Sequence, residues 1–132
     1  MPDANRRPTA LDFSQTPFIV IWETTRACDL ACVHCRATAQ PDPLPGELSR
    51  AEAMDLIDQV TDMGTPVIVF SGGDPLKRSG LTDLIRHAKR RGLRVGTIPA
   101  AAPRLTREAI FALKEAGLDQ IAFSLDASRR RP

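Results

Sequence analysis

Four short apolar runs separated by three helical patterns are the feature that most limits how this sequence can fold. The runs lie at residues 18–22, 66–70, 93–98 and 121–125. Three of them are continuous apolar stretches, which are typical of parallel strands covered on both faces of a sheet. Strands that alternate with helices form right-handed βαβ units. The sequence therefore predicts an α/β fold built on a parallel βα-repeat sheet of about four strands.

Each helical pattern is followed by a glycine, which readily takes the left-handed conformation that ends helices. The expected helices span about residues 49–64, 79–92 and 106–117. The first opens with a capping box, in which Ser49 and Glu52 each satisfy a free backbone N–H. These boundaries leave one long connection, residues 23–48, between the first strand and the first helix. Long connections inside a compact domain are usually functional.

The length of 132 residues allows one domain, and 42% hydrophobic residues are enough for a core. Residues 1–17 contain three prolines and no periodicity, so we expect a mobile leader there. Residues 18–128 form the expected folded domain. Residues 129–132 are an expected basic tail, because three arginines precede the last proline.

Charge and hydropathy exclude two classes of partner. The net charge is only +2, and acidic and basic residues are interspersed, so we expect no nucleic-acid surface. The longest apolar run, residues 18–22, is too short to span a bilayer, and no signal peptide opens the sequence. We therefore expect no membrane partner and a cytoplasmic location.

All three cysteines, Cys28, Cys32 and Cys35, fall within eight residues of the long connection. An odd number cannot form a closed set of disulfides in one chain. In a reducing compartment, cysteines this dense usually bind a metal or take part in a reaction. The spacing C-x3-C-x2-C supplies three ligands to one centre, so the fourth position is either filled by another group or left open.

Two alternatives concern the same cysteines. His34 would complete a Cys3His zinc site, although it adjoins Cys35 and neighbouring residues rarely both reach one metal without strain. The other alternative is that all three thiols are buried and unligated, and act as small hydrophobic side chains.

Four candidate functional segments come directly after the expected strands. They are the cysteine segment, Ser71–Pro75, Thr97–Ala100 and Ser124–Asp126. In α/β folds, ligands bind at the edge where parallel strands have their carboxyl ends. We therefore expect the functional site at this edge.

The stretch Glu23-Thr-Thr-Arg-Ala-Cys-Asp-Leu-Ala-Cys-Val-His-Cys35 resembles the opening signature of the radical S-adenosylmethionine (radical SAM) superfamily. That signature is C-x3-C-x-aromatic-C, with His34 in the aromatic position. The resemblance implies that Cys28, Cys32 and Cys35 each bind one iron of a [4Fe–4S] cluster. It also implies that the fourth iron binds S-adenosylmethionine (SAM).

A second segment, Gly72-Gly-Asp-Pro75, is similar to the family's Gly-Gly-acid-Pro motif after the second strand, which holds the methionine ammonium group. The same residues also suit an ordinary turn. Ser124-Leu-Asp126 is similar to a family segment near the ribose and the methionine carboxylate. The resemblance implies no catalytic residue beyond the cluster ligands. The candidate cofactor-binding residues are His34, Gly72, Gly73, Asp74, Pro75, Thr97, Ser124 and Asp126.

The resemblance covers about residues 17–128. The family's core domain is a (β/α)6 barrel, so the resemblance implies a partial TIM-like barrel that is truncated after about four strands. The expected alternatives are then a fragment, a truncated reading frame, or one half of a barrel that a second chain completes as a partner.

The implied function is that of a radical SAM enzyme, or of a fragment of one. It reductively cleaves SAM to a 5′-deoxyadenosyl radical that abstracts hydrogen from an unknown substrate, with an external one-electron donor. The flanking residues resemble a branch near enzymes that modify peptides or haem precursors, which implies a peptide or a tetrapyrrole as substrate. The alternative is a catalytically silent iron–sulfur-binding module.

Overall fold

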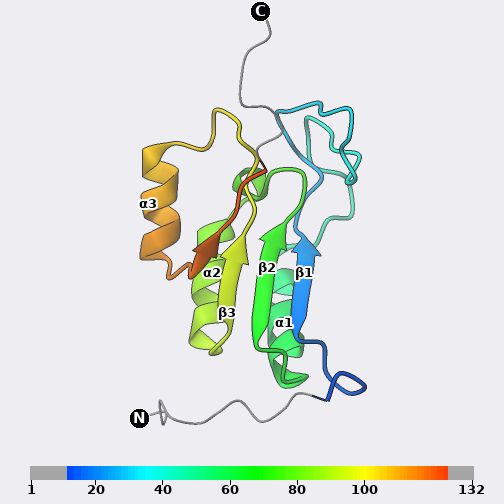
Figure 1. Ribbon diagram of the computed structural model, residues 1–132, viewed down its shortest axis with the longest axis vertical. Helices are drawn as coiled ribbons and strands as arrows, with labels where there is room; N and C mark the ends of the chain where they lie inside the picture. The colour runs from blue at the N-terminus through cyan, green and yellow to red at the C-terminus, as the bar shows by residue number, and fades with distance from the viewer. Residues whose placement is uncertain (1–11, 125–132) are drawn as a thin grey trace, which may run out of the picture.

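Four parallel strands form one sheet, and their order in space is their order in the chain (Figure 1). The computed structural model describes residues 12–124. The strands are β1 (Ile19–Glu23), β2 (Val67–Ser71), β3 (Arg94–Thr97) and β4 (Gln120–Ile121). Most of the expected leader, the basic tail and Asp126 lie outside the described residues.

Three α-helices connect the strands, and a short 3-10 helix follows β2. Their bounds are α1 (Arg50–Asp62), η1 (Pro75–Lys77), α2 (Leu81–Arg90) and α3 (Arg107–Glu115). The predicted capping box is confirmed, because the Glu52 N–H donates to Ser49 Oγ at 3.2 Å and the Ser49 N–H donates to Glu52 Oε2 at 2.7 Å. Gly64 has a φ of 85°, the left-handed conformation predicted at the end of this helix.

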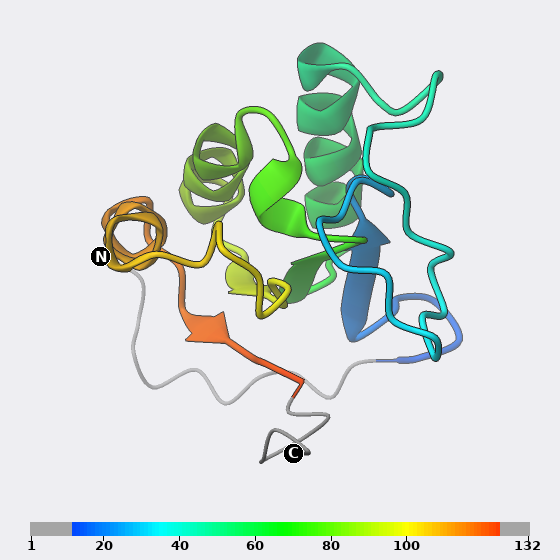
Figure 2. The ribbon, with the colours of Figure 1, turned by 90° about the horizontal axis from the view of Figure 1, so that it is seen from above.

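The three α-helices lie on one side of the sheet, as the view from above shows (Figure 2). A doubly wound sheet would reverse its strand order and carry helices on both faces. Here each strand is added beside the previous one in the same direction, as in a βα-barrel. The predicted parallel βα-repeat fold is therefore confirmed, and its winding is that of an arc of a TIM-like barrel.

The core lies between the sheet and the helices. Phe70 of β2 is fully buried, and Trp22 of β1 meets it edge-on with ring centroids 5.9 Å apart. Helix residues complete this core, and those that are at most 1% exposed are Ala53, Ile57, Leu84, Ile85, Ala88 and Leu113.

The opposite face of the sheet differs from the sequence prediction. Ile19 and Ile21 of β1 are 42% and 59% exposed, so the prediction that both faces are covered is wrong for β1, whereas β3 is buried along Val95–Thr97. The reason is that every crossover helix runs on the same side, and the four described strands form an open arc that does not close into a barrel over the other face. Between residues 12 and 124, no helix is long and apolar enough to cross a bilayer.

We expect Ile57→Ala to lower the free energy of unfolding by about 2–5 kcal/mol, because it leaves a cavity between α1 and the sheet. Ile110→Ala in α3 is the matched control, since Ile110 is 43% exposed and its truncation should cost less than about 1 kcal/mol. Urea unfolding measures both values. Equal losses would show that α1 does not pack on the sheet as described.

Candidate functional site

The loops that follow the strands meet at the carboxyl edge of the sheet (Figure 1) and line a pocket with a volume of about 280 Å³. Its lining includes seven of the residues singled out from the sequence. They are Cys28, Cys32, His34, Cys35, Gly72, Gly73 and Ser124. The structure therefore brings the cysteine segment, the Gly-Gly segment and the end of the described chain to one place.

Other candidates from the sequence do not line this pocket. Asp74 and Pro75 are buried behind it. Thr97 is 1% exposed, and its hydroxyl donates to the Phe70 carbonyl at 2.8 Å. Asp126 lies beyond the described residues. For these four residues, direct contact with a cofactor stays a prediction.

The cysteine loop and the Gly-Gly segment are in direct backbone contact. The Gly73 N–H donates to the Thr25 carbonyl at 2.8 Å, and the Asp74 N–H donates to the Ala27 carbonyl at 2.7 Å. A Cβ atom on Gly73 would lie 2.5 Å from the Ala27 oxygen, and one on Gly72 would lie 2.4 Å from the Thr25 oxygen. Both positions therefore require glycine, because a neighbouring loop occupies the space of a side chain.

Asp74 joins two walls of the site. Its Oδ1 accepts the N–H of Leu76 at 3.0 Å and the N–H of Ala100 at 3.3 Å, so it ties the β2 loop to the β3 loop. Its other oxygen, Oδ2, is buried without a hydrogen-bond partner among residues 12–124. A buried unpaired carboxylate oxygen is costly, and such groups mark places where a donor belongs.

Glu47 holds the start of the cysteine loop. Its Oε1 accepts the Arg26 N–H at 2.9 Å, and the Leu44 N–H and the Thr25 hydroxyl at 3.1 Å each. Partial burial opposes the charged form of Glu47, but these three donors outweigh it and hold the pKa below its ordinary value of 4.5. No motif marked Glu47, because its partners are distant in the sequence.

Arg78 holds both ends of the same loop. Its guanidinium donates to the Thr24 carbonyl at 3.1 Å and to the Leu48 carbonyl. It also lies over the Trp22 ring, 5.6 Å from the centroid, where cation–π attraction helps to fix it.

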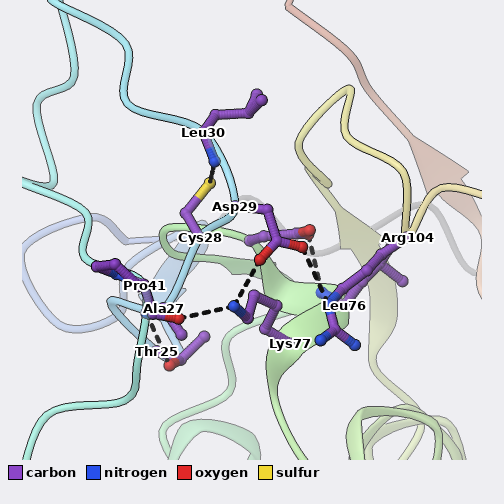
Figure 3. A network of polar contacts seen from close by, with 10 residues as sticks. Thr25, Ala27, Cys28, Asp29, Leu30, Pro41, Leu76, Lys77 and Arg104 are labelled. Atoms are coloured by element: carbon purple, nitrogen blue, oxygen red, sulfur yellow. Dashed lines mark hydrogen bonds and ion pairs between the residues drawn. The ribbon is translucent and has the colours of Figure 1, made fainter.

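Asp29 connects the cysteine loop to two other loops (Figure 3). Lys77 Nζ lies 2.7 Å from Asp29 Oδ1, and Arg104 Nε lies 3.2 Å from Asp29 Oδ2. The hydrogen bond from Lys77, assisted by the charge of Arg104, holds the pKa of Asp29 below its ordinary value. Its position next to Cys28 was the only signal in the sequence that could have found it.

The three cysteines differ in environment. Cys28 is 7% exposed, and its Sγ accepts the Leu30 N–H at 3.4 Å, whereas Cys32 and Cys35 are exposed. The alternative of three buried thiols is therefore wrong. The described chain also gathers no three His, Cys, Asp or Glu side chains around one point. The zinc alternative thus lacks a ready-formed site.

A cubane cluster fits this arrangement better than a single ion does. Its cysteine ligands bind different irons, so they need to surround a pocket rather than converge on a point. Three thiols line the pocket, and the unpaired oxygen of Asp74 lies in the loop beside it. The residues present therefore fit an iron–sulfur cluster that leaves one position for another ligand.

A barrel-type α/β sheet with three cysteines on one loop at its carboxyl edge defines a cofactor-binding domain. Residues 22–131 match the Radical SAM superfamily, and the chain belongs to this family. Members of the family use a [4Fe–4S] cluster and SAM.

Three of the relatives found are named AdoMet-dependent heme synthase or Fe-coproporphyrin III synthase. The chain is 43% identical over 122 residues to the AdoMet-dependent heme synthase of Oleidesulfovibrio alaskensis, covering 92% of this chain and 31% of that protein. It is 42% identical over 125 residues to the enzyme of the same name from Nitratidesulfovibrio vulgaris, covering 95% and 34%. It is 41% identical over 111 residues to the Fe-coproporphyrin III synthase of Methanosarcina barkeri, covering 84% and 28%. The chain thus spans about a third of the length of these relatives.

Two solved structures have a fold similar to that of this chain. Streptococcus suis SuiB bound to S-adenosylmethionine superimposes with a TM-score of 0.66 at 16% identity, covering 83% of this chain and 24% of SuiB. BtrN in an open conformation gives a TM-score of 0.65 at 19% identity, covering 79% of this chain and 48% of BtrN. At these identities the likeness concerns the fold alone.

We expect Gly73→Ala to lower the free energy of unfolding by about 2–3 kcal/mol and to raise the rate at which Cys28 reacts with a thiol reagent. The added Cβ would meet backbone oxygens at 2.5 and 2.7 Å, so the cysteine loop must move.

Gly96→Ala is the control, because its Cβ would meet atoms no closer than 3.5 Å. Urea unfolding and labelling followed by mass spectrometry measure both effects. If the Gly73 variant keeps Cys28 as protected as the Gly96 variant does, the close contact of the two loops is contradicted.

We expect Glu47→Gln to cost about 1–2 kcal/mol of stability near neutral pH, because three donors lose a charged acceptor. The folded pKa of Glu47 is lowered, so its contribution is complete above the ordinary value of 4.5 and fades as the pH falls through the folded value.

The difference in unfolding free energy between wild type and Glu47→Gln, measured in urea from pH 7 down to pH 3, should therefore shrink on acidification. Glu115→Gln, at an exposed position at the end of α3, should cost less than about 0.5 kcal/mol. A Glu47 effect that is independent of pH would rule out the charged carboxylate as its cause.

Proposed function

We propose that this chain is the cluster- and SAM-binding part of a radical SAM enzyme. The observation that carries the proposal is the shared pocket at the carboxyl edge of the sheet, which all three cysteines and the Gly-Gly segment line. Family membership supports radical SAM chemistry, and the pocket is where we propose that the cluster and SAM bind.

We assign Cys28, Cys32 and Cys35 as ligands of three irons, which leaves the fourth iron to the amino and carboxylate groups of SAM. Gly72 and Gly73 bring the main chain of the β2 loop close to this position. Asp74 and Pro75 hold that loop from behind, since both are buried and Asp74 bonds two backbone N–H groups. The contact of Asp74 with the SAM ammonium group remains a prediction from the sequence, and its unpaired Oδ2 supports it as an acceptor without a donor.

His34 and Ser124 line the same pocket and are assigned to the adenosyl part of SAM. Thr97 supports the β3 loop through its bond to Phe70. For Asp126, contact with the ribose or carboxylate remains a prediction from the sequence.

When bound, the cluster supplies one electron to the SAM sulfonium, which yields methionine and a 5′-deoxyadenosyl radical for hydrogen abstraction. The residues of this chain would bind and orient the two groups. The electron comes from an external donor.

For the substrate, we propose a tetrapyrrole of the haem-precursor class rather than a peptide. Relatives that are 41–43% identical to this chain are named heme synthases and an Fe-coproporphyrin III synthase. SuiB, which has been crystallised with a precursor peptide, is only 16% identical. Because the chain spans about a third of the length of these relatives, the substrate is proposed for the whole enzyme.

The test is anaerobic reconstitution with iron and sulfide, followed by dithionite and SAM. We expect about four irons per chain, a brown oxygen-sensitive chromophore and the formation of 5′-deoxyadenosine, measured by liquid chromatography. Cys32→Ala should abolish all three. Val33→Ala, in the same turn and with a fully exposed side chain, should leave them unchanged.

A cluster without 5′-deoxyadenosine would identify a silent iron–sulfur module and overturn the enzymatic proposal. Air-stable binding of one zinc per chain, with no chromophore, would overturn the cluster assignment as well.

A further inference from the structure

Asp29 lies where three loops meet, and each loop follows a different strand (Figure 3). Asp29 itself belongs to the loop after β1 and directly follows Cys28. Lys77, its partner at 2.7 Å, ends η1 after β2. Arg104, its partner at 3.2 Å, belongs to the loop between β3 and α3. One carboxylate thus joins the cysteine loop to the loops after β2 and β3, which also line the pocket.

The two cations hold Asp29 to different degrees. The Lys77 side chain is 13% exposed, and its ammonium also donates to the Pro41 carbonyl at 2.7 Å. Lys77 therefore bonds the cysteine loop at two points, Asp29 and Pro41, which lie on either side of Cys32 and Cys35. The Arg104 side chain is 53% exposed, and exposed ion pairs contribute little. Lys77 is the main partner, and Arg104 is the weaker one.

Cys28 is the best-fixed of the three cysteines. Its N–H donates to the Gln40 carbonyl at 2.7 Å, and its thiol is nearly buried. Cys32 and Cys35 are exposed, and they share a turn closed by the Cys35 N–H and the Cys32 carbonyl at 3.1 Å. A displacement of Cys28 would therefore move a cluster relative to the Gly-Gly segment more directly than a displacement of the other two.

We propose that Asp29 is a positioning residue, which fixes Cys28 relative to the loops after β2 and β3 and so sets the cluster at the right place for SAM. This inference rests on the proposed function. The three thiols do not depend on Asp29 for their chemistry, so a cluster forms without it. The alignment between that cluster and the SAM-binding loops is lost.

The test compares Asp29→Asn with Asp83→Asn. Asp83 is a closely matched control, because it also lies between two cations, Arg50 at 3.0 Å and Arg86 at 3.1 Å. Its side chain is 37% exposed, against 35% for Asp29. It lies in the first turn of α2, away from the residues that line the pocket.

After anaerobic reconstitution, we expect the Asp29 variant to keep the iron content of the wild type. Its dissociation constant for SAM should rise about tenfold. The change that SAM causes in the electron paramagnetic resonance spectrum of the reduced cluster should weaken. Asp83→Asn should match the wild type in all three measurements, and the unfolding midpoints of both variants report any general loss of stability.

Arg104→Gln is the second variant, and it decides the matter if Asp29→Asn does not fold. Arg104→Gln should also raise the SAM dissociation constant, but by less than Asp29→Asn does. Combined with Asp29→Asn, Arg104→Gln should add nothing, because Arg104 acts on the cysteine loop through Asp29.

Wild-type protein that acquires no cluster would overturn the proposed function. Wild-type protein that binds cluster and SAM, with an Asp29 variant indistinguishable from the Asp83 variant, would overturn the positioning role alone. Loss of iron in the Asp29 variant would overturn it too, because Asp29 would then retain the cluster rather than align it.

Discussion

The main-chain contact between residues 25–27 and residues 73–74 is the interaction on which the rest of the site depends. Two backbone hydrogen bonds, at 2.8 and 2.7 Å, join a loop that carries the cysteines to a loop that carries two glycines. Such an approach is possible only where no Cβ intervenes. The glycines therefore serve the contact between two loops of the protein, in addition to any approach of the main chain to a cofactor.

The winding of the sheet makes this contact possible. Because the strands are parallel and follow one another in order, successive loops emerge side by side at the same edge. Asp74 then links the second loop to the third, and Asp29 links the first to both. The site is thus built from short segments that are far apart in the sequence and adjacent in space.

Much of the fold could be predicted from the sequence, because its signals are local. The capping box at Ser49 and the terminating Gly64 act within a few residues, and the alternation of strands and helices fixes a parallel sheet. The cysteine spacing likewise identified one of the loops that line the pocket.

The exposure of one face of β1 could not be predicted, because a continuous apolar run such as Ile19–Ile21 does not show whether its second face is covered. The partners of Glu47 and Asp29 were also missed, since Arg26 is 21 residues from Glu47 and Arg104 is 75 residues from Asp29. Sequence patterns do not show hydrogen bonds between residues that are so far apart in the chain.

Arg78 has a consequence for how the loop between Thr24 and Leu48 can evolve. One guanidinium bonds both ends of it, so the entry and the exit of the segment are fixed independently of what lies between them. The entropy of closing a loop grows only with the logarithm of its length, and doubling the length costs about 0.6 kcal/mol. Insertions and deletions between Cys35 and Gln40 should therefore be tolerated, provided that Arg78, its two carbonyl partners and the contacts of Gln40, Pro41 and Glu47 keep their places.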